Sequence, residues 1–211
     1  MPEAIRTETA QRAVLFATGR HLDDEEHTPQ HSAPLMLLVD RPFVQHAVEV
    51  MAGAGIKHVD IVLSEVPERY RKLLGDGKRW GMTFDYHLAR DPERPYLVLK
   101  VVDLNDTECV LIGHADRLPL FDKNDLMLRK GERVRCFHDA GMDSRKHDAD
   151  WTGWALMAGE LAVDADREMD EDRLRRWFHR LEDTKRPQTC VTCLAADSYD
   201  NLLKANCAVL N

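Results

Sequence analysis

The residue best placed for chemistry is Asp116, which follows an apolar run at residues 107–114. A run of this kind is typical of a buried strand, and open α/β sheets bind their ligands at the carboxyl ends of strands. A carboxylate at this point could therefore contact a bound ligand. The structural alternative is that Asp116 caps the turn after the strand, with Arg117 as its partner.

A histidine- and carboxylate-rich stretch could bind a divalent metal. His21, His27 and His31 surround four consecutive carboxylates at residues 23–26. Imidazole and carboxylate together suit zinc or manganese. Because long polar loops usually place such side chains in water, the pattern favours a solvated loop over a metal site.

Two cysteines have half of a zinc-site spacing. Cys190 and Cys193 are three residues apart, and Cys136 with His138 would have to supply the other two ligands. The run around Cys190 is typical of a buried strand, in which residues three apart face opposite sides. The pattern therefore favours structural thiols.

The elements that must position these residues alternate between strand and helix. The hydrophobic pattern predicts strands at residues 12–18, 58–64, 82–88, 107–114, 133–138, 154–161 and 189–195. It predicts helices from Pro42 to the glycines at 53 and 55, and at residues 66–74, 96–102, 170–183 and 198–210. Such alternation indicates βαβ units, so we expect an α/β fold with a mostly parallel central sheet and flanking helices. We expect a single domain over residues 1–211, with residues 1–11 disordered.

Composition narrows the class of protein. The chain has 211 residues and a net charge of -8, which argues against nucleic acid as a main partner. No apolar run approaches the roughly 20 residues that span a bilayer, so no membrane association is expected. The five cysteines have no regular spacing, which suits a reducing compartment. We expect a cytoplasmic protein.

Several motifs, taken in order, resemble one known family. Residues 73–86 read Leu-Leu-Gly-Asp-Gly-Lys-Arg-Trp-Gly-Met-Thr-Phe-Asp-Tyr, a helix end, a glycine turn and a strand. Other segments with the expected order and type are residues 13–19, 40–46, 54–59, 110–116 and 197–206. Together they resemble the sugar-phosphate nucleotidyltransferases, relatives of the glucose-1-phosphate and mannose-1-phosphate enzymes. The resemblance implies their Rossmann-like three-layer sandwich.

The resemblance also implies a reaction and a site. A sugar 1-phosphate attacks the α-phosphorus of a nucleoside triphosphate (NTP), and pyrophosphate leaves. Asp116 would be catalytic and would hold Mg²⁺ with Asp197 as second ligand, while Gly19 and Arg20 would bind the nucleotide. An alternative alignment moves the second metal position to Ala195. On the structural interpretation, Asp197 precedes or caps the last helix together with Ser198, and Gly19 makes a turn.

The phosphate-binding positions depart from the family pattern. The second glycine of the family loop falls on His21, its arginine falls near Asp23, and its lysine falls on Ala33. The carboxylates at 23–26 would each cost on the order of 1 kcal/mol beside a triphosphate at surface dielectric. The glycine-rich stretch after the third strand is replaced by residues 91–96, Asp-Pro-Glu-Arg-Pro-Tyr.

Three functional hypotheses follow. The first is a nucleotidyltransferase of nucleotide-sugar or surface-polysaccharide metabolism, with NTP and a sugar 1-phosphate as partners and Mg²⁺ as cofactor. The second is a catalytically inactive relative, a pseudoenzyme that acts as a regulatory or protein-interaction module. The third is an enzyme with different phosphate-binding groups, such as Arg20 or Lys185. The helix faces at residues 43–51 and 174–181 could serve the core, a homo-oligomer or a protein partner.

Overall fold

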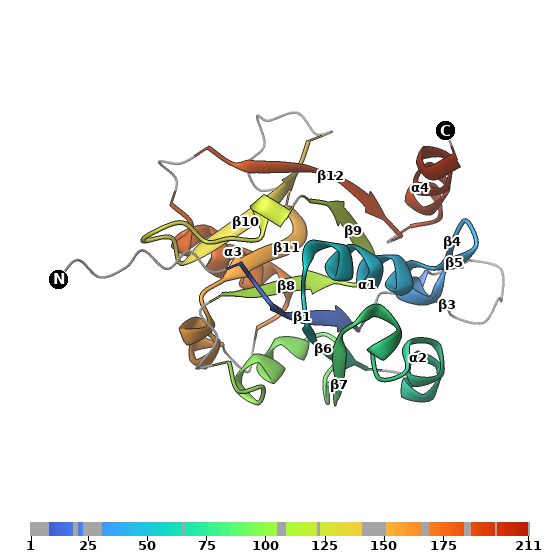
Figure 1. The fold of residues 1–211 in the computed structure, drawn as a ribbon, viewed down its shortest axis with the longest axis horizontal. Helices are drawn as coiled ribbons and strands as arrows, with labels where there is room; N and C mark the ends of the chain where they lie inside the picture. The colour runs from blue at the N-terminus through green and yellow to red at the C-terminus, as the bar shows by residue number, and fades with distance from the viewer. Residues whose placement is uncertain are drawn as a thin grey trace.

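An eight-stranded mixed sheet in the order β7-β6-β1-β8-β11-β10-β12-β9 forms the centre of the structure (Figure 1). This computed structural model describes residues 9–18, 21–22, 31–64, 66–104, 109–121, 123–140, 151–165, 169–183, 187–196 and 198–210. The strands of the sheet are β1 (Arg12–Ala17), β6 (His58–Leu63), β7 (Thr83–Leu88), β8 (Val110–His114), β9 (Arg117–Leu120), β10 (Val134–Asp139), β11 (Trp151–Met157) and β12 (Thr189–Ala195). Two small hairpins add β2 (His21–Leu22) with β3 (His31–Ser32), and β4 (Leu37–Leu38) with β5 (Arg41–Pro42).

The first half of the sheet is parallel. β1 pairs in parallel with β6 on one side and with β8 on the other, and β7 pairs in parallel with β6. All residues of β1 after Arg12 are buried, as a strand covered on both faces requires. These four strands confirm the βαβ units expected from the sequence.

The second half of the sheet is mixed. β11 runs antiparallel to both of its neighbours, β8 and β10, while β12 is parallel to β10 and antiparallel to β9. The strand expected at residues 154–161 lies earlier in the chain. β11 starts at Trp151 and ends at Met157, and a 3₁₀ helix, η5 (Gly159–Asp164), follows it. β9 was not expected, because Pro119 lies inside it and proline signals a break in a strand.

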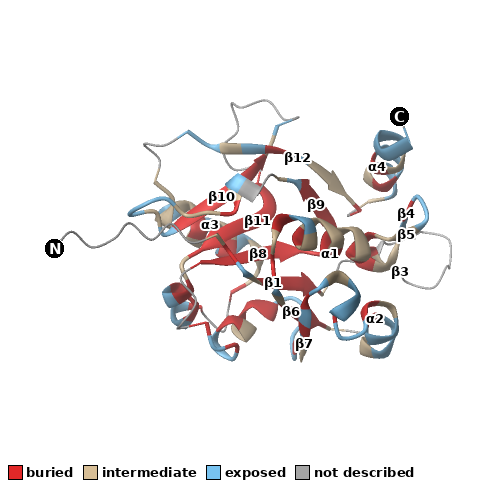
Figure 2. Ribbon diagram, in the orientation of Figure 1, coloured by how far each residue is buried: buried red, intermediate tan, exposed pale blue. Residues whose placement is uncertain are grey.

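Helices cover both faces of the sheet (Figure 2). One face packs against α1 (Phe43–Ala54), α2 (Pro67–Leu74) and α4 (Tyr199–Leu210). The other packs against α3 (Glu171–Leu181), η3 (Pro95–Lys100) and η5. The short 3₁₀ helices η1 (Ala33–Leu35), η2 (Lys78–Trp80) and η4 (Lys123–Asp125) complete the described elements. The predicted three-layer arrangement is confirmed, although the helix expected at 96–102 is the 3₁₀ helix η3. No helix in the described ranges is long and apolar enough to cross a membrane.

The glycine-rich turn between α2 and β7 has the conformation that its sequence predicts. Gly75, Gly77 and Gly81 all have positive φ, at 65°, 87° and 70°. A Cβ atom on Gly77 would lie 2.9 Å from the carbonyl oxygen of Met82, so a larger residue would displace the backbone of this turn. The hydroxyl of Tyr86 donates to the carbonyl oxygen of Gly75 at 2.7 Å and ties β7 to the end of α2.

Candidate functional site

The candidate site lies at the carboxyl ends of the adjacent parallel strands β1 and β8. From β1 the chain continues to β6 on one side, and it later returns to β8 on the other, so β1 and β8 border the point where the strand order reverses. This switch point is where open α/β sheets bind ligands. The amide of Ala115 donates to the carbonyl oxygen of Phe16 at 2.8 Å and holds the two strand ends together. Gly19 and Arg20 follow β1 in the sequence, outside the described residues.

Asp116 is buried at this switch point, with 4% of its surface exposed. Its Oδ1 atom has no hydrogen-bond partner among the described residues. Arg117, the partner expected under the structural interpretation, forms an ion pair with Oε1 of Glu171 at 2.7 Å. Because an unsatisfied buried polar group costs about 1–3 kcal/mol and more when it is charged, the structure favours a partner for Oδ1 beyond the described residues. A hard divalent cation such as Mg²⁺ binds carboxylate oxygens, so Asp116 fits that role.

The end of β12 lies beside Asp116. Ala195 is paired with Arg117 across β12 and β9, and the amide of Ala196 donates to the carbonyl oxygen of Asp116 at 2.8 Å. Asp197, the predicted second metal ligand, is the next residue in the sequence and lies outside the described residues. Ser198 Oγ accepts a hydrogen bond from the amide of Asn201 at 3.2 Å, which confirms the predicted cap of α4.

Two glycines that the sequence analysis did not single out shape the turn that carries Asp116. A Cβ atom on Gly113 would lie 2.3 Å from the ring of Trp154, whose Nε1 donates to the carbonyl oxygen of Arg117 at 2.9 Å. A Cβ atom on Gly153 would lie 2.6 Å from the guanidinium of Arg117. The signal that could have revealed them is a glycine inside a buried strand, because such a glycine often marks a place where another group approaches the backbone closely.

A histidine–tyrosine pair lies on the sheet face that η3 covers. Nε2 of His114, the last residue of β8, lies 3.0 Å from the hydroxyl oxygen of Tyr96. The ring of Phe16 packs on Tyr96 with 4.7 Å between centroids. Tyr96 belongs to the segment that replaces the glycine-rich stretch of the family, and here it is buried against the end of β8 rather than exposed to a ligand.

Among the described residues at which the resemblance predicts phosphate binding, no basic side chain is available for a phosphate. Ala33, at the lysine position, is fully buried in η1. Arg41, the basic residue at the start of the resembling segment 40–46, binds both oxygens of Glu49 at 2.7 Å. Residues 23–26 and 185 lie outside the described residues, as do the side chains of the loop histidines His21, His27 and His31.

The two cysteines with half of a zinc-site spacing do not form a metal site among the described residues. Cys190 is exposed and Cys193 is partly buried, and neither belongs to a group of three or more metal-binding side chains among the described residues. Cys136 instead lies with His179 and Glu182.

In sequence, part of the chain is similar to known nucleotidyl-transferring enzymes. No family model matches the chain. Over 111 residues it is 25% identical to the glucose-1-phosphate thymidylyltransferase of Xanthomonas campestris pv. campestris, which covers 50% of this chain and 37% of that protein. Over 81 residues it is 32% identical to the CMP-5'-(3-aminopropyl)phosphonate synthase of Streptomyces rubellomurinus, covering 38% of this chain and 13% of that protein. The matched region thus spans little more than a third of the thymidylyltransferase.

Solved structures share the fold over almost the whole chain. A putative glucose-1-phosphate thymidylyltransferase from Bacillus anthracis has a TM-score of 0.68 at 16% identity, covering 94% of this chain and 95% of that one. The inositol-1-phosphate CTP transferase of T. maritima has a TM-score of 0.67 at 12% identity, with coverage of 95% and 98%. These identities show the fold, and the sequence matches add the family likeness that the motifs predicted.

Proposed function

Because the chain is sugar-phosphate nucleotidyltransferase-like in sequence and fold, we propose that it transfers a nucleotidyl group from an NTP to a sugar 1-phosphate. The observation that carries the proposal is the buried Oδ1 of Asp116, which lacks a partner among the described residues at the switch point between β1 and β8. The pathway would be nucleotide-sugar or surface-polysaccharide metabolism.

Asp116 and Asp197 would hold Mg²⁺, which when bound neutralises charge on the phosphates. The hydrogen bond between Ala196 and Asp116 supports this pairing, because Asp197 is the next residue along the chain. Trp154 and Gly113 fix the turn, so that the Asp116 carboxylate keeps one orientation. Gly19 would allow the backbone to approach the nucleotide, and Arg20 or Lys185 would supply the cation that the Ala33 position lacks. In phosphoryl-group chemistry such positioning provides most of the catalysis.

The test measures pyrophosphate release from each of the five common NTPs with a panel of sugar 1-phosphates and Mg²⁺. We expect turnover in the wild type, and a loss of roughly 100-fold or more in Asp116→Asn, the scale at which one preorganised electrostatic contact acts. Asp172→Asn, at an exposed aspartate in α3, is the matched control and should keep full activity. Full activity in Asp116→Asn would remove Asp116 from the mechanism.

One observation favours the second candidate function, a non-catalytic interaction module. Ala33 is buried and Arg41 is occupied by Glu49, so neither presents a cation to a triphosphate. A thermal-shift screen with Mg²⁺ and millimolar NTP separates the two functions. A nucleotide at about 100 times its Kd adds about 2.7 kcal/mol, or roughly 5–10 °C in melting temperature. An unchanged melting temperature with all NTPs would favour the interaction module.

A further inference from the structure

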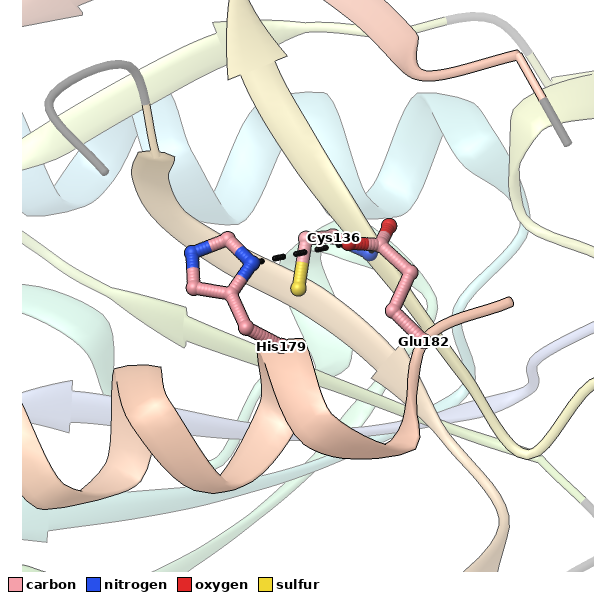
Figure 3. A group of neighbouring side chains, drawn as sticks. All are labelled: Cys136, His179 and Glu182. Carbon is pink, nitrogen blue, oxygen red and sulfur yellow. Dashed lines mark hydrogen bonds and ion pairs between the residues drawn. The ribbon is translucent and has the colours of Figure 1, made fainter. Parts of the chain in front are cut away.

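Potential transition-metal ligands meet between β10 and the C-terminal end of α3. Cys136 and His138 are alternate residues of β10, while His179 and Glu182 lie three residues apart at the end of the helix. The ligand atoms of Cys136, His179 and Glu182 all lie within 4.8 Å of one another, and His138 lies outside this group of three and contacts it through Glu182. Figure 3 shows these three side chains converging, His179 from the last turn of the helix, Glu182 from the residue that follows it and Cys136 from the strand.

Two separations between ligand atoms lie in the range expected for a shared ion. Oε2 of Glu182 lies 3.6 Å from Nδ1 of His179 and 3.8 Å from Nε2 of His138. Ligands of a tetrahedral zinc ion, each about 2.0–2.3 Å from the metal, are roughly 3.2–3.8 Å apart. Both distances are too long for good hydrogen bonds, so a direct contact does not satisfy these groups.

His138 is the strongest sign that a ligand is needed. The His138 side chain is 2% exposed, and both of its ring nitrogens are buried without a hydrogen-bond partner among the described residues. Nε2 of His179 is likewise buried without a hydrogen-bond partner among the described residues. Native proteins satisfy nearly all buried polar atoms, and an unsatisfied one usually indicates a bound water, an ion or a functional role.

The two oxygens of the Glu182 carboxylate have different surroundings. The amide of Cys136 reaches Oε1 at 3.0 Å, which leaves Oε2 facing the two rings. One carboxylate oxygen is thus placed where it could share an ion with two imidazoles.

A second group of metal-binding types, His58, Asp60 and Asp85, differs in one respect. Its buried carboxylate, Asp60, already accepts hydrogen bonds from Arg12 at 2.8 Å and contacts His87 at 2.9 Å. The charge of Asp60 is therefore compensated by the protein itself, and this group serves as an internal control.

We propose that Cys136, His179 and Glu182 form the centre of a structural zinc site that joins α3 to β10, with His138, beside Glu182, as the fourth ligand. One thiolate, two imidazoles and one carboxylate are ligands that zinc prefers, and four protein ligands make a closed structural site. Binding displaces the thiol proton of Cys136 to solvent as the sulfur–zinc bond forms. The proposal is independent of nucleotidyl transfer.

The site would stabilise the helix that borders the candidate active site. At the other end of α3, Glu171 forms the ion pair with Arg117, next to Asp116. His179 also lines an open groove of about 680 Å³ along α3. Zinc would thus fix the end of α3 that lies away from Arg117.

The experiment uses untagged protein, stripped with a chelator and titrated with Zn²⁺ against a competing chromophoric chelator, and in parallel with Co²⁺. We expect one tight site per chain, a higher melting temperature with zinc, and a cobalt spectrum with tetrahedral d–d bands and a thiolate charge-transfer band. Cys136→Ser should remove the charge-transfer band, whereas Cys190→Ser, at an exposed cysteine, should retain it.

Two conservative variants separate a loss of zinc binding from a loss of folding. His179→Gln and Glu182→Gln should weaken zinc by more than the roughly 10- to 100-fold that changes around a metal's ligands cause, with far-ultraviolet circular dichroism unchanged. His58→Gln, in the control group, should bind zinc as the wild type does. The proposal is overturned if the wild type takes up no tightly held zinc. It is equally overturned if folded Cys136→Ser, His179→Gln and Glu182→Gln all keep wild-type zinc affinity.

Discussion

Asp116 combines burial with an incomplete set of hydrogen bonds, and this combination favours a ligand-binding carboxylate over a turn cap. A capping aspartate is stabilised by the groups it caps, whereas Oδ1 of Asp116 is buried without a partner among the described residues. Such groups lower the stability of the metal-free protein, and they are retained where function requires them.

Asp116→Asn should therefore stabilise the metal-free protein. Replacing a buried carboxylate that has one unsatisfied oxygen by a neutral group of the same shape removes part of its desolvation cost, and we expect a gain of about 1 kcal/mol in unfolding free energy. Urea denaturation in the presence of a chelator measures the change. Asp60→Asn is the contrasting case and should destabilise, because it breaks contacts with Arg12 and His87. A clear loss of stability in Asp116→Asn would restore the turn-capping interpretation.

Gly113→Ala should destabilise the protein by about 1–3 kcal/mol, the range typical of overpacking a dense core. The added methyl group would lie 2.3 Å from the indole of Trp154, so the ring or the strand must move. Chemical denaturation measures the loss, and Gly53→Ala, where nothing lies within 4 Å of the new atom, is the control. If Trp154→Leu in the same chain failed to offset the effect of Gly113→Ala, the steric explanation would be wrong.

The site residues differ in how far sequence could reveal them. Asp116 was predictable because its signal is local, an acidic residue directly after a continuous apolar run. Gly113 was not, because its requirement comes from Trp154, which is distant in the sequence and adjacent only in the folded sheet. The same holds for Cys136, whose neighbours His179 and Glu182 lie on another element.

At the scale of elements, β1, β6 and β7 were predicted to within one residue at each end, whereas β8 begins at Val110, three residues after its predicted start. The second half was harder to predict. β9 is short and contains a proline, and the boundary of β11 was misplaced because Gly153 interrupts its pattern of apolar residues. In both cases tertiary contacts, rather than local preference, decide the structure.

The N-terminus of helix α3 is capped by a side chain whose contribution to stability can be measured. Asp170 caps it by accepting a hydrogen bond from the amide of Arg173 at 2.8 Å. Asp170→Ala should destabilise the protein by about 1 kcal/mol, as the loss of an N-cap usually does. Thermal unfolding measures the change, with Asp172→Ala, at an exposed position in the same turn, as the control with a smaller effect. Equal effects of the two variants would indicate a helix-dipole contribution instead of a specific cap.

At the scale of the whole molecule, one sheet joins two hydrophobic cores. Leu15 and Phe16 are consecutive in β1, yet Leu15 belongs to the core beneath α1 and Phe16 to the core beneath α3. A strand that is buried on both faces thus couples the two helical layers, and neither layer has a complete core without it.

This coupling predicts that the chain unfolds as one cooperative unit. Leu15→Ala, a truncation in β1, should cost about 2–5 kcal/mol. Three of the four tryptophans, Trp151, Trp154 and Trp177, lie in the second half of the chain, so their fluorescence reports mainly on that half. If the sheet is one unit, Leu15→Ala lowers the denaturation midpoint by the same amount in tryptophan fluorescence and in far-ultraviolet circular dichroism. A fluorescence midpoint that stayed at the wild-type value would show that the antiparallel half folds independently of β1.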